Sequence, residues 1–235
     1  MSQRKRQHGP YQEKRGILSR PLRVQSQMAY GPPVARVFLA AALVASFSAV
    51  VGAAAHADDG WRVMRDRDGV TLERRSVDGS RFYEYRVSAH TTVSPAVAVE
   101  RIWRGIGDER SPTIKHRTVV RRAGDELVVY DQIHAAVVSD RDVTIRIHKS
   151  SDGHGAFDIS FESTSELGPP PAAGYVRLPV VRGSWRIEPT ADGGSNLMYR
   201  CYSEPGGAIP AFLVRGAQQD STLDEFERVL TRVGR

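Results

Sequence analysis

Two neighbouring segments decide the fold: Val143-Thr-Ile-Arg-Ile-His-Lys149 and, after the turn Ser151-Asp152-Gly153, Gly155-Ala-Phe-Asp-Ile-Ser-Phe-Glu-Ser163. Apolar and polar residues alternate along both. Such alternation is typical of antiparallel strands that bury one face and expose the other to water. The predicted buried face therefore holds Val143, Ile145, Ile147, Phe157, Ile159 and Phe161. The predicted solvent face holds Thr144, Arg146, His148, Asp158, Ser160 and Glu162.

Further strand-like segments flank this pair, at residues 70–77, 82–93, 114–122, 126–135, 175–180, 183–189 and 195–203. A short helix is predicted to begin at Ser94-Pro95 and to end near Gly105 or Gly107. Residues 210–233 carry a helical apolar stripe formed by Phe212, Leu213, Leu223, Phe226, Leu230 and Val233. The pattern predicts an α+β domain in which the last helix covers one antiparallel sheet of about seven to nine strands.

Positive charge is concentrated at the N-terminus. The 235 residues carry a formal net charge of +6, but residues 1–57 hold eight basic side chains against one acid, Glu13. The other 178 residues hold 25 basic and 26 acidic side chains. We therefore expect no nucleic-acid partner, because phosphate binding needs a basic footprint on the folded domain. A net charge near zero also predicts that any membrane contact is transient and apolar.

The N-terminal segment has the features of an export signal. Arg36 precedes an apolar run, residues 37–55, which leads into Ala55-His56-Ala57, a small-x-small cleavage pattern. Met28 stands eight residues before Arg36 and is the predicted translation start. We expect residues 1–57 to be an N-terminal extension and signal peptide, cleaved after Ala57. Residues 58–235 would then form one domain in the periplasm or outside the cell. An uncleaved N-terminal anchor is the alternative.

No catalytic or metal-binding motif stands out. None of the histidines after residue 57 has a His or Cys partner at metal-ligand spacing; they are His90, His116, His134, His148 and His154. Cys201 is the single cysteine and is expected to be a small buried apolar residue. Gly206-Gly207 lacks the residues of a phosphate-binding loop. We expect no metal, no cofactor and no enzymatic activity.

Ser139-Asp140-Arg141-Asp142 is the densest charged cluster on an otherwise apolar path. Alternating charges of this kind usually form a solvated turn held by local hydrogen bonds. An acid/base pair would need one of the carboxyl groups to be buried, so that the two pKa values separate. We therefore expect this cluster to have a structural or ligand-gating role.

Several motifs together resemble a known family. They are Trp61 with Asp68-Gly69-Val70, Ser139-Asp140-Arg141-Asp142-Val143, Arg182-Gly183-Ser184-Trp185 with Pro189, and Glu204-Pro205-Gly206-Gly207-Ala208-Ile209-Pro210. These residues resemble START domains, which are lipid-transfer domains related to the steroidogenic acute regulatory protein, and they extend over about residues 60–233. The resemblance implies a helix-grip fold, with a curved antiparallel sheet wrapped around a long C-terminal helix and a hydrophobic tunnel between them.

The resemblance implies that a monomer binds one lipid or other hydrophobic small molecule in the cavity between sheet and helix. The candidate ligand-binding residues are Val143, Ile145, Phe157, Ile159, Phe161, Trp185, Leu197, Tyr199, Phe212 and Leu213. Ligand access would require movement of the start of the last helix or of a gate loop. The gate loop is formed by Val137, Val138, Ser139, Asp140, Arg141 and Asp142.

Two other classes of function stay open. The first is an enzyme of the wider helix-grip superfamily, of the cyclase or hydrolase type, acting on an apolar substrate. It would need polar groups that converge in the cavity, for which Tyr85, Asp131 and Tyr199 are the candidates. The second is a protein with a structural role that binds a segment of another protein in its apolar groove. Fold alone cannot choose among the three classes.

Overall fold

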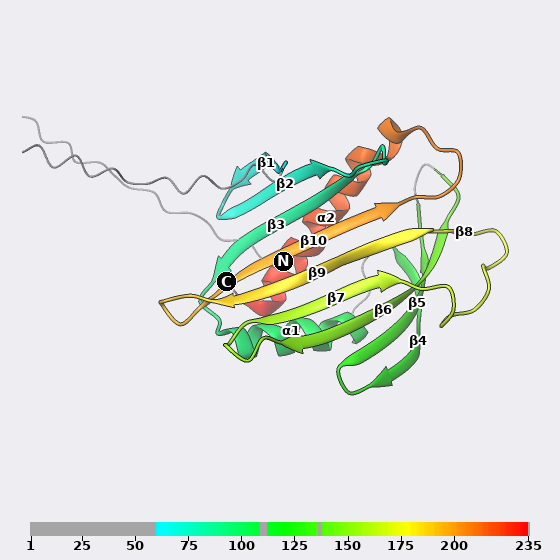
Figure 1. The fold of residues 1–235 in the computed structure, drawn as a ribbon. Helices are drawn as coiled ribbons and strands as arrows, with labels where there is room; N and C mark the ends of the chain where they lie inside the picture. The colour runs from blue at the N-terminus through cyan, green and yellow to red at the C-terminus, as the bar shows by residue number, and fades with distance from the viewer. Residues whose placement is uncertain (1–59, 109–111, 136–137, 235) are drawn as a thin grey trace, which may run out of the picture. The chain divides into compact units, whose positions relative to one another are not determined.

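The computed structural model describes residues 60–108, 112–135 and 138–234 (Figure 1). The predicted signal peptide and its cleavage site lie outside these residues. The described residues form ten strands and two helices. In chain order these are β1 (Arg62–Arg67), β2 (Val70–Ser76), β3 (Tyr83–Thr91), α1 (Pro95–Asp108), β4 (Ile114–Ala123), β5 (Glu126–Ile133), β6 (Arg141–Ser151), β7 (Phe157–Ser163), β8 (Val176–Arg177), β9 (Val180–Pro189), β10 (Ser195–Glu204) and α2 (Ala211–Val233).

The strands form one sheet in the order β1-β2-β3-β10-β9-β7-β6-β5-β4, with β8 pairing in parallel beside β6. All neighbours along the main path are antiparallel. The predicted fold class is confirmed. The predicted number of strands was too low, because β1 shows no clean alternation of apolar and polar residues. The segment 175–180, predicted as a full strand, contributes only the two residues of β8.

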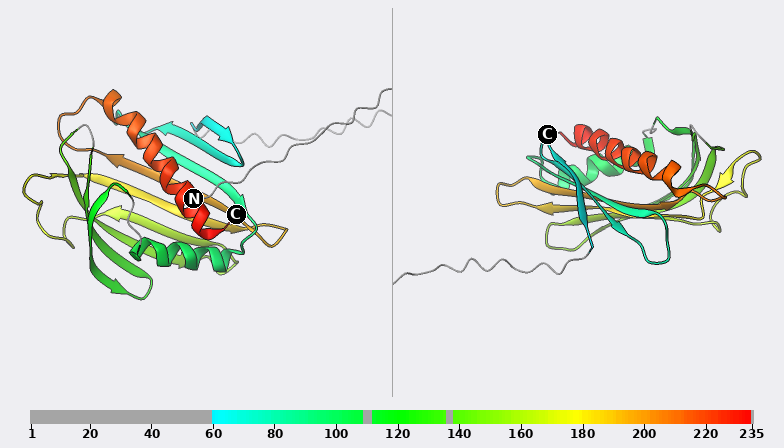
Figure 2. Two further views of the ribbon diagram at one scale, coloured as in Figure 1. Left: turned by 180° about the vertical axis from the view of Figure 1, so that it is seen from behind. Right: turned by 90° about the horizontal axis from the view of Figure 1, so that it is seen from above.

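Both helices lie on the same face of the sheet, and α2 runs across it (Figure 2). The alternation that predicted β6 and β7 is confirmed, since Val143, Ile147 and Ile159 are buried while Arg146 is exposed. Thr144 is an exception: it was placed on the solvent face but is buried. The loop after β7 covers it so closely that a Cβ atom at Gly168 would lie 1.8 Å from the Thr144 hydroxyl.

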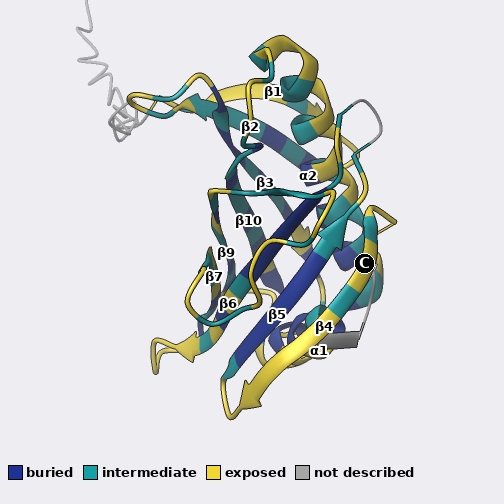
Figure 3. Cartoon of the chain, turned by 90° about the vertical axis from the view of Figure 1, so that its right-hand side faces the viewer, coloured by how far each residue is buried: buried dark blue, intermediate teal, exposed yellow. Residues whose placement is uncertain are grey.

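The two edge strands of the sheet, β1 and β4, are mostly exposed. Figure 3 shows that β5 is mostly buried whereas its neighbour β4, at the sheet edge, is mostly exposed. The β4 strand carries basic side chains, among them Lys115, Arg121 and Arg122, and the opposite edge strand β1 carries Arg62, Arg65 and Arg67. Charged residues on edge strands disfavour pairing with another chain.

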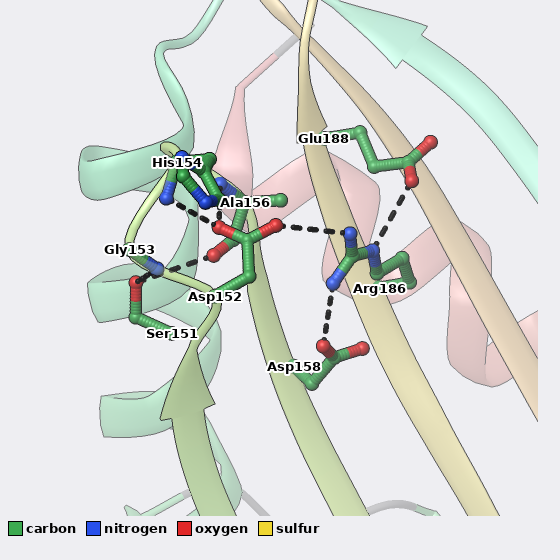
Figure 4. A network of polar contacts seen from close by, with 8 residues as sticks. All are labelled: Ser151, Asp152, Gly153, His154, Ala156, Asp158, Arg186 and Glu188. Carbon is green, nitrogen blue, oxygen red and sulfur yellow. Dashed lines mark hydrogen bonds and ion pairs between the residues drawn. The ribbon is translucent and has the colours of Figure 1, made fainter.

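A network of charged side chains fixes the β6–β7 turn on the solvent side (Figure 4). The Arg186 guanidinium on β9 forms ion pairs with Asp158 at 2.6 Å, with Glu188 at 3.1 Å and with Asp152 at 3.2 Å. Asp152 also accepts hydrogen bonds from the backbone N–H groups of the turn, and the one from His154 contributes most to lowering the pKa of its carboxyl group. Exposed pairs contribute little stability, so this network mainly orders the turn.

Four aromatic rings join α2 to the sheet. Phe226 of α2 stacks on Trp185 of β9 with a centroid separation of 5.5 Å, and Trp185 stacks on Tyr199 of β10 at 4.6 Å. Tyr199 in turn stacks on Phe161 of β7 at 6.0 Å. Such pairs contribute about 0.5–1.5 kcal/mol each beyond the area that they bury. The row therefore connects three neighbouring strands to the covering helix.

The two halves of α2 are held differently. Its buried residues all lie in the second half: Thr222, Phe226, Val229, Leu230 and Val233. The last turn is also fixed by polar contacts, because the Arg101 guanidinium donates to the Val233 carbonyl and the Thr91 hydroxyl donates to that of Gly234. The predicted stripe is wrong at its beginning. Phe212 is 75% exposed and Leu213 is 46% exposed, since the first turns extend beyond the buried part of the sheet.

Gly183 on β9 offers a test of how closely the sheet packs beneath this aromatic row. A Cβ atom there would lie 2.0 Å from the Arg200 carbonyl oxygen and 2.4 Å from the Phe161 ring. Gly183→Ala is therefore expected to lower the free energy of unfolding by about 1–3 kcal/mol. The measurement is a urea unfolding curve.

Gly216→Ala is the matched control, because no atom lies within 4 Å of the added Cβ and the residue is helical. It is expected to raise stability by up to about 1 kcal/mol. Equal midpoints for the two variants would contradict the close packing at Gly183.

Candidate ligand cavity

A cavity of about 240 Å³ lies between the sheet and the second half of α2. The end of α1 and strands β4 to β7, β9 and β10 also contribute to its walls. The lining residues are Gly105, Ile106, Thr113, Ile114, Arg117, Asp131, Ile133, Ile145, Ile147, Phe161, Val181, Trp185, Tyr199, Cys201, Ser221, Thr222, Glu225, Arg228, Val229 and Arg232. The described part of the chain thus contains the sheet–helix cavity that the fold class predicts.

One wall of the cavity is apolar. It is formed by side chains of the central strands, such as Ile145, Phe161, Val181 and Trp185. These positions belong to the face of β6, β7 and β9 that points toward α2. Phe161, Trp185 and Tyr199 belong to the aromatic row, so rings that connect α2 to the sheet also line the cavity. An apolar wall of this kind favours ligands that lose contact with water on binding.

The opposite wall is polar and comes largely from α2. Ser221, Glu225, Arg228 and Arg232 follow one another at spacings of four, three and four residues, so they share one side of the helix. Glu225 accepts a hydrogen bond from Arg228. Burial lowers the pKa of Arg228, and its proximity to the Arg117 guanidinium lowers it further.

The floor beside α1 holds a buried ion pair. Arg117 of β4 donates to both carboxylate oxygens of Asp131 on β5, each at 2.6 Å, and to the Ile106 carbonyl at 2.6 Å. The Asp131 residue is only 2% exposed. This pair satisfies both charges in a site that excludes water, so the polar floor does not require a ligand to be stable.

Arg232 reaches from the last turns of α2 to α1. A Cβ atom at Gly105 would lie 1.7 Å from its guanidinium nitrogen, so only glycine leaves room for this contact. Burial lowers the pKa of Arg232. A side chain at this position of α1 would therefore displace the guanidinium group of Arg232.

The thiol of Cys201 and the hydroxyl of Tyr199 face the same space. Burial raises the pKa of Cys201 from its ordinary value of 9.0 to about 11. Burial also raises the pKa of Tyr199 well above its ordinary value. Both groups are therefore neutral at physiological pH. Cys201 is half-buried, whereas a fully buried apolar residue was predicted.

The structure places the ten candidate ligand-binding residues in four groups. Ile145, Phe161, Trp185 and Tyr199 line the cavity. Phe157, Ile159 and Leu197 pack in the core, and Val143 lines a smaller hollow of about 200 Å³ beside β8. Phe212 and Leu213 are exposed and do not line the cavity. Contact of the first four with a ligand stays a prediction.

Sequence reasoning missed most of the polar wall. The α2 positions could have been found, because residues 221, 225, 228 and 232 form a polar helical stripe beside the apolar one. Arg117 had no such signal within its basic strand. The three polar residues considered for catalysis do not converge: Asp131 and Tyr199 line the cavity, whereas the Tyr85 hydroxyl donates to the Arg215 carbonyl at 3.0 Å and is not part of its lining.

Asp142 anchors the loops at one end of the cavity. It is 0% exposed and accepts hydrogen bonds from Arg177 at 2.8 Å, from the Tyr130 hydroxyl at 2.9 Å and from the Ala172 N–H at 2.8 Å. Burial by itself would raise the pKa of Asp142, but these donors outweigh it and the pKa lies below its ordinary value. The network ties the proline-rich loop after β7, and β8, to β6.

Its neighbour Arg141 anchors a different loop. The buried guanidinium donates to the Pro205 carbonyl at 3.1 Å, which joins β6 to the connection between β10 and α2. Asp140 pairs with Lys115 at 2.5 Å, and that bond is the main reason why the pKa of Asp140 falls to about 2.

The predicted gate loop is thus shorter than expected. Arg141 and Asp142 begin strand β6 and are buried rather than part of a solvated turn, because each meets a partner far away in the sequence. Ser139 is exposed, Val138 is partly buried, and Val137 lies outside the described residues. A gating role for the remaining loop stays a prediction.

No group of three or more His, Cys, Asp or Glu side chains within the described residues is placed to hold a metal ion. No helix in the same residues has the length and apolar character needed to cross a membrane.

Loss of the Asp142 carboxylate should destabilise the fold strongly. Asp142→Ala removes the buried acceptor of three hydrogen bonds and leaves the partly buried Arg177 without its carboxylate, so it is expected to cost about 3 kcal/mol in the free energy of unfolding. Arg146→Ala, on the same strand as Asp142, breaks an exposed pair with Glu162 of β7 and should leave the unfolding midpoint nearly unchanged. Urea unfolding of both variants measures the difference. Similar midpoints would show that Asp142 is not the anchor.

The Cys201 thiol should react slowly in the folded protein. A pKa of about 11 instead of 9.0 leaves about 100-fold less thiolate at pH 7, and thiolate is the reactive form. The rate with Ellman's reagent is expected to fall by at least that factor relative to the same protein in denaturant. A native rate within tenfold of the denatured rate would contradict the raised pKa of this thiol.

Comparison with known proteins agrees with this architecture. An uncharacterized protein of Pseudomonas aeruginosa is 27% identical over 186 residues, which cover 77% of this chain and 90% of that protein. The crystal structure of the STAR-related lipid transfer protein of Xanthomonas axonopodis has a TM-score of 0.65 at 23% identity, covering 75% of this chain and 100% of that chain. Human StAR-related lipid transfer protein 5 has a TM-score of 0.61 at 18% identity, covering 75% and 87%.

The two solved structures share the fold of this chain. The START domain pattern matches residues 48–235, which is most of the chain and includes every motif that suggested the resemblance. This chain belongs to the START domain family.

Proposed function

We propose that this START domain binds one lipid or other hydrophobic small molecule in the cavity between the sheet and α2. The observation that carries the proposal is the empty space of about 240 Å³, bordered on one side by Ile145, Phe161, Val181 and Trp185. Membership of the START family and the similarity to lipid transfer proteins support it.

The volume of the cavity sets the scale of binding. It corresponds to about eight water molecules at ~30 Å³ each. An acyl segment of about eight methylenes in that space would gain ~6 kcal/mol at ~0.8 kcal/mol per methylene. Before the costs of ordering are subtracted, this equals a dissociation constant of tens of micromolar. Hydrophobic burial alone is therefore sufficient for measurable binding.

The cavity has an apolar wall on the strands and a polar wall on α2, and this arrangement suits an amphiphilic ligand. Its apolar part would lie on the strand wall, and its polar part would face Glu225 and Arg228 of α2. The Arg117–Asp131 pair keeps the floor polar without exposing an unpaired charge. Cys201 and Tyr199 are neutral at physiological pH and add no charge to the apolar wall.

Larger ligands would need the cavity to open. The first half of α2 has no buried side chain and is held by hydrogen bonds, such as those from Gln218 to the Ser203 carbonyl at 2.9 Å and hydroxyl at 3.0 Å. Regions held in this way open at lower free energy than a packed core. We propose that ligand enters when this half and the adjoining loop around Ser139 move.

We further propose that the domain acts outside the cytosol and passes its ligand between membranes. The support is the basic, then apolar, N-terminal segment that ends at Ala55-His56-Ala57. An exported protein that encloses an acyl chain could carry it through water, where the free lipid is poorly soluble.

Native mass spectrometry of the protein purified from the envelope of its own cells tests both parts. We expect an added mass from a co-purifying lipid and a mature chain that begins at Asp58. A chemically transformed small molecule would favour an enzyme, and a bound polypeptide would favour a structural partner. A protein that binds no lipid after incubation with lipid extract would overturn the proposal, and a purified chain that begins before Asp58 would overturn the cleavage.

A bulky side chain at the mouth should block loading. Ser221 lines the cavity yet is exposed, so Ser221→Trp is expected to reduce lipid uptake at least tenfold without disturbing the core. Asp224→Trp places the same ring on an exposed position of α2 outside the lining and serves as the control. Equal lipid loading in the two variants would show that the ligand does not occupy this cavity.

A further inference from the structure

Four arginines gather at one corner of the sheet, beside the first turns of α2. This arginine patch consists of Arg62 on β1, Arg74 on β2, Arg81 in the β2–β3 turn and Arg215 on α2. Figure 1 shows this turn beside the beginning of α2. The Tyr83 ring is contacted by the guanidinium groups of Arg74 at 4.4 Å and Arg215 at 4.8 Å.

Direct contacts join the members of the patch. The Arg215 Nε donates to the Arg81 carbonyl at 3.0 Å, which holds α2 against the turn. Arg62 stands directly across from Arg74 in the β1–β2 pairing, and both border a surface hollow that also includes Tyr83. Like charges placed opposite each other on paired strands destabilise a sheet, so this arrangement has a cost.

The patch keeps its positive charge. Within the described residues none of its four guanidinium groups forms an ion pair with a carboxylate. The neighbouring Arg75, Arg86 and Arg200, which surround the Trp61 ring, are by contrast matched by carboxylates on the adjacent strands.

Two acids stand in the same region, Asp78 in the β2–β3 turn and Asp220 on α2, and neither pairs with the patch. The local balance is therefore two positive charges, although the domain as a whole is nearly neutral.

Exposed apolar side chains at the beginning of α2 lie beside the patch. Phe212 is 75% exposed, and it precedes Arg215 by three residues, so the two share one side of the helix. Leu213 beside it is 46% exposed. A large aromatic side chain next to unpaired arginines is the composition of surfaces that lie in the interface of a membrane.

We propose that this corner docks on an anionic lipid bilayer, with the arginine patch on the lipid headgroups and Phe212 inserted at the level of the acyl chains. The charges fit the negative surface of such a bilayer, and the apolar side chains fit the layer beneath it.

A nucleic acid fits less well. Proteins that bind it typically neutralise about six to ten phosphates, whereas the patch offers four cations and an apolar projection. A soluble acidic protein would account for the charge but leaves the exposure of Phe212 unused.

The proposal goes beyond ligand binding and does not depend on it. It does place the membrane near the cavity, because Phe212 and Ser221 are nine residues apart on α2, or about 14 Å along the helix axis. Lipid loading by native mass spectrometry and vesicle docking are separate measurements, so either can fail alone.

The first experiment measures cosedimentation of the full chain with vesicles of phosphatidylcholine, with or without a one-third share of phosphatidylglycerol. The pair Arg62→Gln and Arg81→Gln should weaken binding to the anionic vesicles about 25-fold, at about fivefold per arginine. Arg104→Gln with Arg122→Gln removes two exposed, unpaired arginines elsewhere and should change binding less than twofold. Equal effects of the two pairs would overturn the proposal.

The second experiment measures the environment of one labelled residue. Membrane contacts made by other parts of the chain therefore do not produce its signal. A nitrobenzoxadiazole label is attached through Phe212→Cys in a Cys201→Ala background, with Asp224→Cys as the control position. Anionic vesicles should shift the emission of the label at position 212 to the blue and leave the label at 224 unchanged. No shift at 212, or a shift on adding a soluble acidic polypeptide such as polyglutamate, would overturn the assignment to a bilayer.

Discussion

The stacking of Phe226 on Trp185, continued through Tyr199 to Phe161, is the contact on which the rest of the structure depends. It fixes the distance between α2 and the middle of the sheet. On one side of this row the second half of the helix packs into a dry core, and on the other side the rings leave a space. Without the row, the polar side of α2 would have no reason to stand apart from the sheet, and the cavity would have no defined width.

Polar contacts arrange the ends of the same assembly. Arg141 and Asp142 are adjacent in the chain and therefore point to opposite sides of β6, so that one strand residue holds the loop before α2 and the next holds the loop after β7. At the far end of the helix, Arg101 fixes the last turn. Charged groups thus determine which parts of the fold are firmly held, while apolar packing supplies most of the stability.

Periodicity predicted the sheet, its buried face and the covering helix, because alternation along β6 and β7 follows directly from which side faces the core. It could not predict the long-range partners of Asp142, which are the Ala172 N–H 30 residues away and Arg177 35 residues away. It also overestimated the burial of Phe212, since a helical stripe does not show where the sheet beneath it ends. Net charge does not show where the charges lie: the nearly neutral total includes a corner where Arg62 and Arg74 stand opposite each other.

The unequal attachment of α2 has a geometric consequence. A helix of 23 residues is about 34 Å long, and its fixed points lie at Phe226 and in its final turn. It can therefore pivot about a point close to its C-terminal end. The arm from Phe226 to the first residue of the helix is about 22 Å, so a tilt of about 10° would displace that tip by about 4 Å. A strain too small to disturb the aromatic contacts would thus be amplified into a displacement comparable to the width of an acyl chain.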